Sequence, residues 1–245
     1  MFKKLATGLA ALAGLAFAAP AHADPITLGA GDEGTTFSIN LNGFVGDSSS
    51  TIDNLTSTLT FTLDSVSGDR YDFSYTVDNT TSGGLTSNIS SFAFNVDPDI
   101  VGATVDGAYS YTFVTDGRSS DPRYPNQIGA VDVCFKAKNS GSCSNGGGVS
   151  EGNSGSGTLS LFFDPDVSEI TLSDFFVRYQ GISGAGNVGS ASGEQISSTS
   201  GTTTSSTTSG TPVPAPGMLG LLALALVSLG FMRRRRDHVE QPAFA

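Results

Sequence analysis

Charged side chains are scarce in this chain: Asp, Glu, Lys and Arg make up 14% of its 245 residues, against about 25% in an average soluble domain. Trp is absent, and Cys and His occur twice each. A coiled coil, a helical bundle and a basic nucleic-acid-binding protein all need far more Lys, Arg, Glu or Leu, so these classes are excluded. Two Cys are too few for a mini-protein built on a disulfide framework.

Small uncharged residues take the place of the missing charge. The chain holds 31 Gly, 34 Ser and 25 Thr, together 90 of 245 positions. Its hydrophobic content of 38% is too high for a fully disordered chain. The composition therefore predicts a Gly/Ser/Thr-rich β protein, with distinct segments at its two ends.

The first 23 residues have the pattern of a secretory signal peptide. Lys3 and Lys4 supply the positive start, residues 5–17 form a short apolar stretch, and Ala21 and Ala23 are the small residues of a cleavage site. We expect export through the Sec translocon and cleavage after Ala23. The alternative is an uncleaved N-terminal anchor.

Near the other end, residues 217–232 carry no charge, and four arginines follow them at once: Arg233, Arg234, Arg235 and Arg236. A helix of sixteen residues reaches about 24 Å, short for a hydrocarbon core of about 30 Å. Residues 213–216 extend the span to twenty, which is enough with snorkelling arginines. The arginines favour the cytoplasmic side, so we expect type I topology with residues 237–245 as a cytoplasmic tail.

The order of features at this end resembles the PEP-CTERM sorting domain. A Pro-x-Pro motif precedes the apolar segment and the arginines; its residues are Val213, Pro214, Ala215 and Pro216. In that family the motif is recognised by exosortase, a membrane-embedded cysteine transpeptidase that removes the helix and tail. The family pattern usually has Glu where this chain has Ala215. The alternative is an ordinary single-pass anchor that is never cleaved.

This resemblance implies a Gram-negative bacterium and delivery to the cell surface or to an extracellular, exopolysaccharide-rich biofilm matrix. The paired Cys and the segment 174–182 also resemble the cistern-family subgroup of these proteins, which adds no activity.

Residues 183–211 are mostly Gly, Ser and Thr, which cannot bury a core. We expect a flexible tether with a reach of about 30 Å. The alternative to this plain linker is a tether whose Ser and Thr hydroxyls carry O-linked glycans. Residues 24–182 then form one domain, followed by the tether and by a sorting signal over residues 212–236.

Period-2 alternation in the domain predicts about eight or nine short strands in an antiparallel β-sandwich or jelly roll. The expected strands are 37–41, 57–63, 71–77, 89–96, 108–114, 130–135, 158–163 and 170–179. Seven aromatic residues are expected in the core, namely Phe61, Phe73, Tyr75, Phe92, Phe94, Phe162 and Phe175. Cys134 and Cys143 flank a polar loop in an exported chain, so we expect a disulfide that stabilises the fold by about 2.7 kcal/mol.

The domain lacks most catalytic equipment. His22 and His238 both fall outside it, which excludes Ser–His–Asp and Cys–His nucleophiles and His-ligated metals within it. Residues 24–211 hold 17 Asp and 4 Glu against six basic residues, a net charge of 6 − 21 = −15. A glycosidase carboxylate pair is therefore the remaining enzyme option, although Trp, the strongest sugar-stacking residue, is absent.

Two Asp-Pro-Asp motifs follow aromatic strands. Their carboxylates, Asp97, Asp99, Asp164 and Asp166, are oxygen ligands of the kind that calcium prefers. The alternative is that each motif builds a turn, and neither has the ligand spacing of a calcium loop. No other cofactor is expected.

The sequence thus predicts a non-enzymatic, exported surface or matrix protein. A secreted domain that binds or hydrolyses glycans is the alternative from a different class.

Overall fold

The computed structural model describes residues 25–115, 123–139, 143 and 146–201. The predicted cleavage site at Ala21 and Ala23, the sorting motif 213–216 and the arginines 233–236 lie outside these residues. Within the described segments, no helix combines the length and the apolar character needed to cross a membrane.

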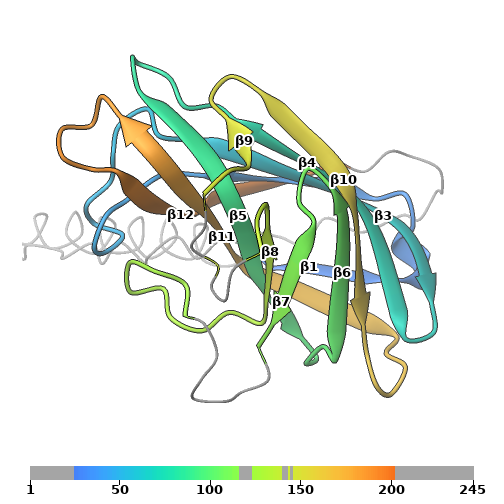
Figure 1. Cartoon of the computed structure of the whole chain (residues 1–245). Helices are drawn as coiled ribbons and strands as arrows, with labels where there is room; N and C mark the ends of the chain where they lie inside the picture. The colour runs from blue at the N-terminus through green and yellow to red at the C-terminus, as the bar shows by residue number, and fades with distance from the viewer. Residues whose placement is uncertain (1–24, 116–122, 140–142, 144–145, 202–245) are drawn as a thin grey trace, which may run out of the picture. The chain divides into compact units, whose positions relative to one another are not determined.

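Almost all regular structure in the described residues is β-strand (Figure 1). The strands are β1 (Ile26–Gly29), β2 (Thr36–Leu41), β3 (Ser57–Ser67), β4 (Arg70–Asn79), β5 (Thr86–Asp97), β6 (Gly102–Gly107), β7 (Tyr111–Val114), β8 (Val133–Lys136), β9 (Val149–Ser150), β10 (Ser154–Phe162), β11 (Glu169–Ser183) and β12 (Ser190–Gly201), with one 3-10 turn, η1 (Ala30–Asp32). Every pairing among these strands is antiparallel. The predicted all-β antiparallel class is confirmed.

The twelve strands form one continuous sheet that curls into a nearly closed barrel. The order is β6-β10-β4-β3-β2-β12-β11-β5-β8-β7, with β1 beside β11 and β9 beside β5. The end strands β6 and β7 meet where the Thr112 hydroxyl donates a hydrogen bond to the Ala103 carbonyl oxygen over 3.1 Å. The predicted sandwich or jelly roll is thus replaced by a single sheet. Its strand count exceeds eight or nine because β1, β6, β9 and β12 lack a clear alternation of large apolar residues.

The core lies between the two halves of this sheet and is dominated by aromatic rings. Phe61 on β3 stacks on Phe37 of β2 with 5.4 Å between ring centroids. Across the core it meets Phe94 of β5 at 5.9 Å and Phe175 of β11 at 5.8 Å. Because strand side chains alternate between faces, these rings fill the interior while polar residues of the same strands face outward.

Six of the seven predicted core aromatics are buried: Phe61, Phe73, Tyr75, Phe92, Phe94 and Phe175. Phe162 is only half-buried, so its core assignment is wrong. Leu161 points inward, and alternation therefore turns Phe162 toward the outer face. Phe163, beyond the end of β10, fills the core instead, with its ring 5.5 Å from that of Tyr71.

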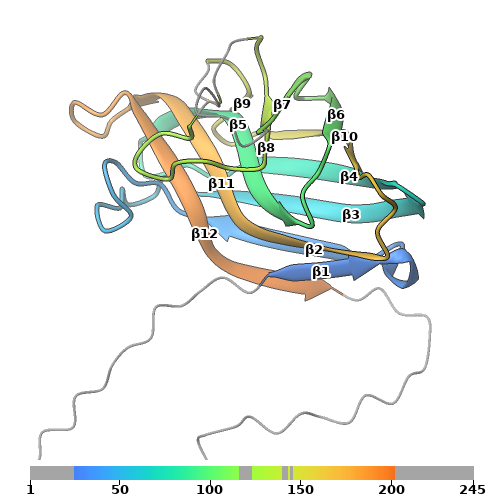
Figure 2. The same ribbon diagram turned by 90° about the horizontal axis from the view of Figure 1, so that it is seen from below.

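The strand β12 corrects the predicted start of the tether at Ser183. Residues 190–201 pair with β11 on one side and with β2 on the other, and the orange ribbon of Figure 2 runs between these neighbours. Backbone groups of two adjacent strands stabilise this segment, although its composition is that of a linker. The remaining residues of the predicted tether, 202–211, lie outside the described residues.

Candidate functional site

A second, smaller hydrophobic cluster lies on the outer side of β5, β8 and β11. Cys134 and Cys143 form a disulfide with 6.1 Å between their Cα atoms, which confirms the predicted pair. Both cysteines are fully buried against Ala93, Tyr124 and Val131. Cys143 and the segment that contains Tyr124 and Val131 thus pack together on this part of the sheet.

Arg178 of β11 connects β12 to the loop that contains Tyr124 and Asn126. Its side chain is only 6% exposed, and its guanidinium donates hydrogen bonds to Ser190 Oγ at 2.8 Å and Ser192 Oγ at 3.3 Å. The Asn126 amide oxygen, oriented toward these donors, accepts from Arg178 Nη1 over 3.0 Å and from the Ser192 N–H over 2.9 Å. Nη1 and Nη2 of this buried cation are thus bound by neutral oxygens from β12 and from one loop, while Nε has no hydrogen-bond partner in the described part of the structure.

Beside Arg178, a cavity of about 240 Å³ opens across β12, and we call it the β12 cleft. It is lined by two aromatic residues, two carboxylates and neutral polar or apolar side chains: Phe44, Asp47, Ser48, Asn126, Gln127, Ile128, Phe176 and Glu194. Asn126 and Gln127 both have left-handed backbones, with φ of 59° and 65°. Non-glycine residues in this region are uncommon and gather at functional sites.

The pKa values of the two carboxyl groups in the β12 cleft are shifted in opposite directions. Burial raises the pKa of Glu194, with a hydrogen bond from Ser48 opposing the shift. Hydrogen bonds from the Ser49 hydroxyl and N–H lower the pKa of Asp47. Two carboxyl groups whose pKa values are shifted apart in one cavity are the arrangement found in acid–base pairs. Amides and an aromatic ring beside them suit a polyhydroxylated ligand.

The two Asp-Pro-Asp motifs lie in the β5–β6 and β10–β11 connections, and both Asp–Pro peptide bonds are cis. All four predicted carboxylates, Asp97, Asp99, Asp164 and Asp166, are exposed. Within the part of the chain that the structure describes, no three His, Cys, Asp or Glu side chains gather closely enough to hold a metal ion. The four aspartates therefore do not assemble into a carboxylate cluster.

Asp99 does line a larger cavity, of about 590 Å³, together with Asp132. The Asp132 carboxylate accepts a hydrogen bond from the Val96 N–H over 2.8 Å, and its own N–H donates to Asn95 Oδ1 over 3.2 Å. These bonds hold the end of β5, so Asp132 has a structural role.

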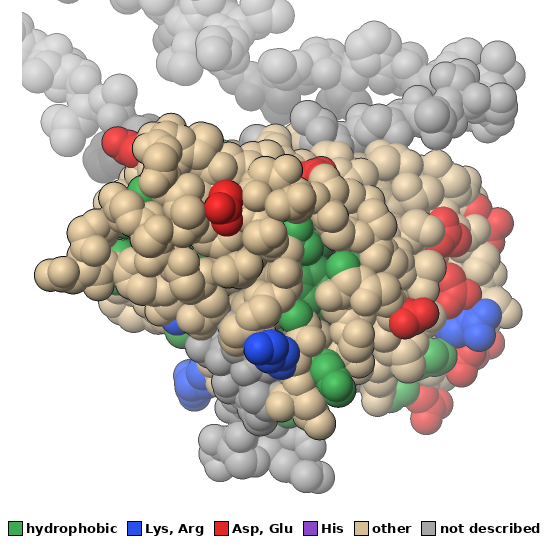
Figure 3. All heavy atoms as spheres, turned by 45° about the horizontal axis from the view of Figure 1, so that its top comes forward, with side chains coloured by type: hydrophobic (Ala, Val, Ile, Leu, Met, Phe, Trp, Pro, Cys, Tyr) green, Lys and Arg blue, Asp and Glu red, His purple; other side chains and the backbone are tan. Residues whose placement is uncertain are grey.

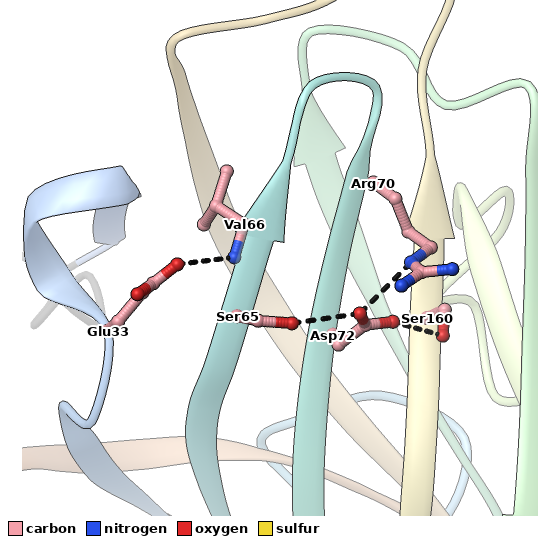
Figure 4. Close-up of polar contacts among 6 residues, drawn as sticks. All are labelled: Glu33, Ser65, Val66, Arg70, Asp72 and Ser160. Carbon is pink, nitrogen blue, oxygen red and sulfur yellow. Dashed lines mark hydrogen bonds and ion pairs between the residues drawn. The ribbon is translucent and has the colours of Figure 1, made fainter.

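The outer face of β2, β3, β4 and β10 is lined with hydroxyls and carboxylates. Its best connected member is Asp72, which accepts hydrogen bonds from Ser65 at 3.0 Å, Ser160 at 2.6 Å and Arg70 Nε at 3.0 Å (Figure 4). Nearby, Glu33 accepts from the Val66 N–H over 2.8 Å. In the view of Figure 3 most of the visible surface is uncharged. Because these polar groups bond one another across strands, they stabilise the sheet.

The sequence did not indicate the β12 cleft. Its residues come from four segments that only the placement of β12 brings together. Pro125 followed by Asn126 was the one local signal, since that pair is typical of a turn.

No protein-family model, curated protein or solved structure matches this chain.

Proposed function

We propose that the chain is an exported, non-enzymatic surface or matrix protein. It crosses the inner membrane through the Sec translocon, and exosortase then cleaves it and releases it to the cell surface or the exopolysaccharide matrix. The observation that supports the proposal is the extent of the strands, which begin after the predicted signal peptide and end before the predicted sorting motif in the sequence. The first strand begins at Ile26, three positions after Ala23, and β12 ends at Gly201, twelve positions before Val213. Both cleavages therefore leave the sheet intact.

The disulfide between Cys134 and Cys143 supports export, because disulfides persist in oxidising compartments and are rare in the cytosol. The structure describes no free cysteine.

Intact-mass analysis of the mature protein tests the proposal. The expected product begins at Asp24 and ends within the segment 213–216. A mass that retains Arg233 to Ala245 overturns the sorting step, and a mass that retains residues 1–23 overturns signal cleavage. Deletion of the exosortase gene in the host is the matched control and should leave the uncleaved form at the membrane.

A domain that binds or hydrolyses glycans is the second candidate, and the β12 cleft favours it. Asp47 and Glu194 line one cavity with pKa values displaced in opposite directions. Retaining and inverting glycosidases both use such a pair of carboxyl groups.

Glycan-array binding and hydrolysis assays of the wild type, Glu194→Gln and Asp47→Asn test this candidate. Loss of hydrolysis in both variants with binding retained assigns an enzyme, and loss of binding alone assigns a binding module. Glu169→Gln at the start of β11 is the matched control, since Glu169 is exposed and is not among the residues lining the cleft. A wild type that neither binds nor cleaves any glycan rejects the candidate.

A further inference from the structure

The strand β12 is central in the sheet but contributes almost no apolar surface to the core. None of its described inward positions carries a large apolar side chain: Ala191 packs in the main core, Gly193 lies against Val177 and Tyr179, and Gln195 and Ser198 pair with Leu41 and Ile39 of β2. Ala191 is the one apolar residue of β12 in the main core. Neighbouring β2 buries Phe37, Ile39 and Leu41, as expected of a strand inside a sheet.

Two more residues weaken the attachment of β12. Both amide atoms of Gln195 are buried without a hydrogen-bond partner in the described part of the structure, which costs free energy relative to their hydration in the released strand. Ile196, the one large apolar residue of the strand, is 55% exposed. Backbone hydrogen bonds to β11 and β2 thus provide most of the attachment, and they reform with any strand of the same register.

The connections of β12 allow the strand to leave its place while the chain stays intact. A six-residue loop, 184–189, joins it to β11, and this loop contains Gly184, Gly186 and Gly189. Gly186 has a left-handed backbone, with φ of 64°. An extended loop would carry β12 away from its own β11 toward another molecule.

We propose that β12 is exchanged between copies of this chain, so that β12 of one copy pairs with β2 and β11 of a second. Reciprocal exchange closes a dimer, and exchange in one direction extends a chain of copies. Main-chain pairing along the two open edges provides the affinity, as in other cases of strand addition.

Arg178 makes a second copy the preferred occupant. Its guanidinium is buried and donates to Ser190 and Ser192 of β12. A strand of another sequence that lacks these hydroxyls leaves donors of a buried cation unsatisfied, which is strongly unfavourable. The position between β2 and β11 therefore favours a strand with the sequence of β12 over strands of other sequence. This inference does not rest on cleavage by exosortase.

Paired glycine variants of the full chain, purified in detergent and sized by light scattering, test the exchange. Gly186→Ala places a side chain on left-handed backbone in the β11–β12 loop. Gly152→Ala does the same in the β9–β10 turn, with φ of 70°. A Cβ at either position meets nothing within 4 Å, so the two variants carry the same local penalty. We expect Gly186→Ala to raise the ratio of oligomer to monomer about five-fold or more, and Gly152→Ala to leave it unchanged.

A disulfide lock gives the second measurement, independent of how well the glycine variants fold. The Ser192 N–H and carbonyl both bond Phe44 and so point away from β11. Ser190, two residues earlier, has the same orientation, and its pair with Gln180 is then of the close, non-hydrogen-bonded type that suits a disulfide. Gln180→Cys with Ser190→Cys should hold β12 in its own molecule, with the added bond verified by mass. Gln180→Ser with Ser190→Ala is the matched control, because it also removes the Ser190 hydroxyl that Arg178 binds but forms no covalent bond.

Two differently tagged preparations are then incubated together and captured through one tag. Co-capture that occurs for the wild type and for the Gln180→Ser, Ser190→Ala control, and that the disulfide lock abolishes, supports exchange. Absence of wild-type co-capture, equal co-capture of the locked protein, or equal oligomer formation by Gly152→Ala and Gly186→Ala each overturns it. An intact mass that contradicts cleavage by exosortase would not change the expected oligomer ratio or co-capture. The sorting proposal and the exchange proposal can therefore be rejected independently.

Discussion

The phenol of Tyr179 donates a hydrogen bond to Ser57 Oγ over 2.8 Å, and both residues are buried. Tyr179 belongs to β11 and Ser57 to β3, so this bond joins the two halves of the sheet through the interior. Burial raises the pKa of the Tyr179 phenol, which therefore stays protonated and able to donate across the physiological range.

Substitution Tyr179→Phe removes this bond and leaves the Ser57 hydroxyl buried without its donor. We expect a loss of about 1–2 kcal/mol in the free energy of unfolding, measured by urea denaturation. Tyr111→Phe is the control, because Tyr111 is 40% exposed and its substitution should be near neutral. Equal effects of the two substitutions would contradict the role of the buried bond.

The double substitution Cys134→Ala and Cys143→Ala should lower the free energy of unfolding by about 2.7 kcal/mol, since the unfolded chain regains the entropy of the opened loop. Urea denaturation of the variant measures the loss. Unfolding of the wild type under reducing conditions should show the same decrease. An unchanged midpoint in both experiments argues against the expected stabilisation.

The backbone of β10 approaches β6 closely at Gly157. A Cβ at this position would lie 1.9 Å from the Asp106 carbonyl oxygen and 2.6 Å from the Tyr75 hydroxyl. Gly157→Ala should therefore separate the two strands and cost about 3 kcal/mol or more, or prevent folding, as judged by urea denaturation and soluble yield. Gly31→Ala, where a Cβ meets nothing within 4 Å, should be tolerated. Comparable stability of the two variants would show that the sheet can relax at Gly157.

The β12 cleft should make stability depend on pH through Glu194. The folded-state pKa of Glu194 is raised above the ordinary value of 4.5. The contribution of this group to the free energy of unfolding is therefore fully present below about pH 4.5 and is lost as the pH rises through the folded-state pKa. Glu194→Gln removes this dependence. The variant should gain stability relative to the wild type between pH 4.5 and neutral pH, as measured by melting temperature.

Asp47 gives the matched control with the opposite sign. Because the folded-state pKa of Asp47 lies below the ordinary value of 3.8, this group stabilises the fold above about pH 3.8. That stabilisation is lost as the pH falls through the folded-state pKa. Asp47→Asn should therefore flatten the acid side of the profile. The same direction of change in both variants would refute the opposed electrostatics of the cleft.

Alternation of large and small residues was sufficient to predict the central strands. In β3 and β4 the inward positions between the buried polar residues Ser57 and Asn79 hold apolar residues, from Leu59 and Phe61 to Tyr75 and Val77. The disulfide was equally accessible, since only one pairing of two cysteines exists within the chain.

The strand β12 and its cleft could not be predicted in the same way. The sequence of residues 190–201 carries neither an apolar face nor a turn signal, and its structure depends on the edges that β2 and β11 offer. Because Glu194 reaches the cleft only through that pairing, the site depends on tertiary contacts that no local pattern encodes. The sorting segments differ from β12, because their motifs can be identified from local sequence alone. These segments lie outside the described residues.

The position of β12 also bears on how the chain is made. Synthesis proceeds from the N-terminus, so β2 is made early, while β12, which covers its second edge, is the last of the described strands to be made. Until then the two halves of the sheet have no hydrogen-bonded connection between β2 and β11, and the most distant pairings in the sequence close the fold. On the proposed export route, the sheet between β2 and β11 is therefore completed only after β12, the last described strand, has crossed.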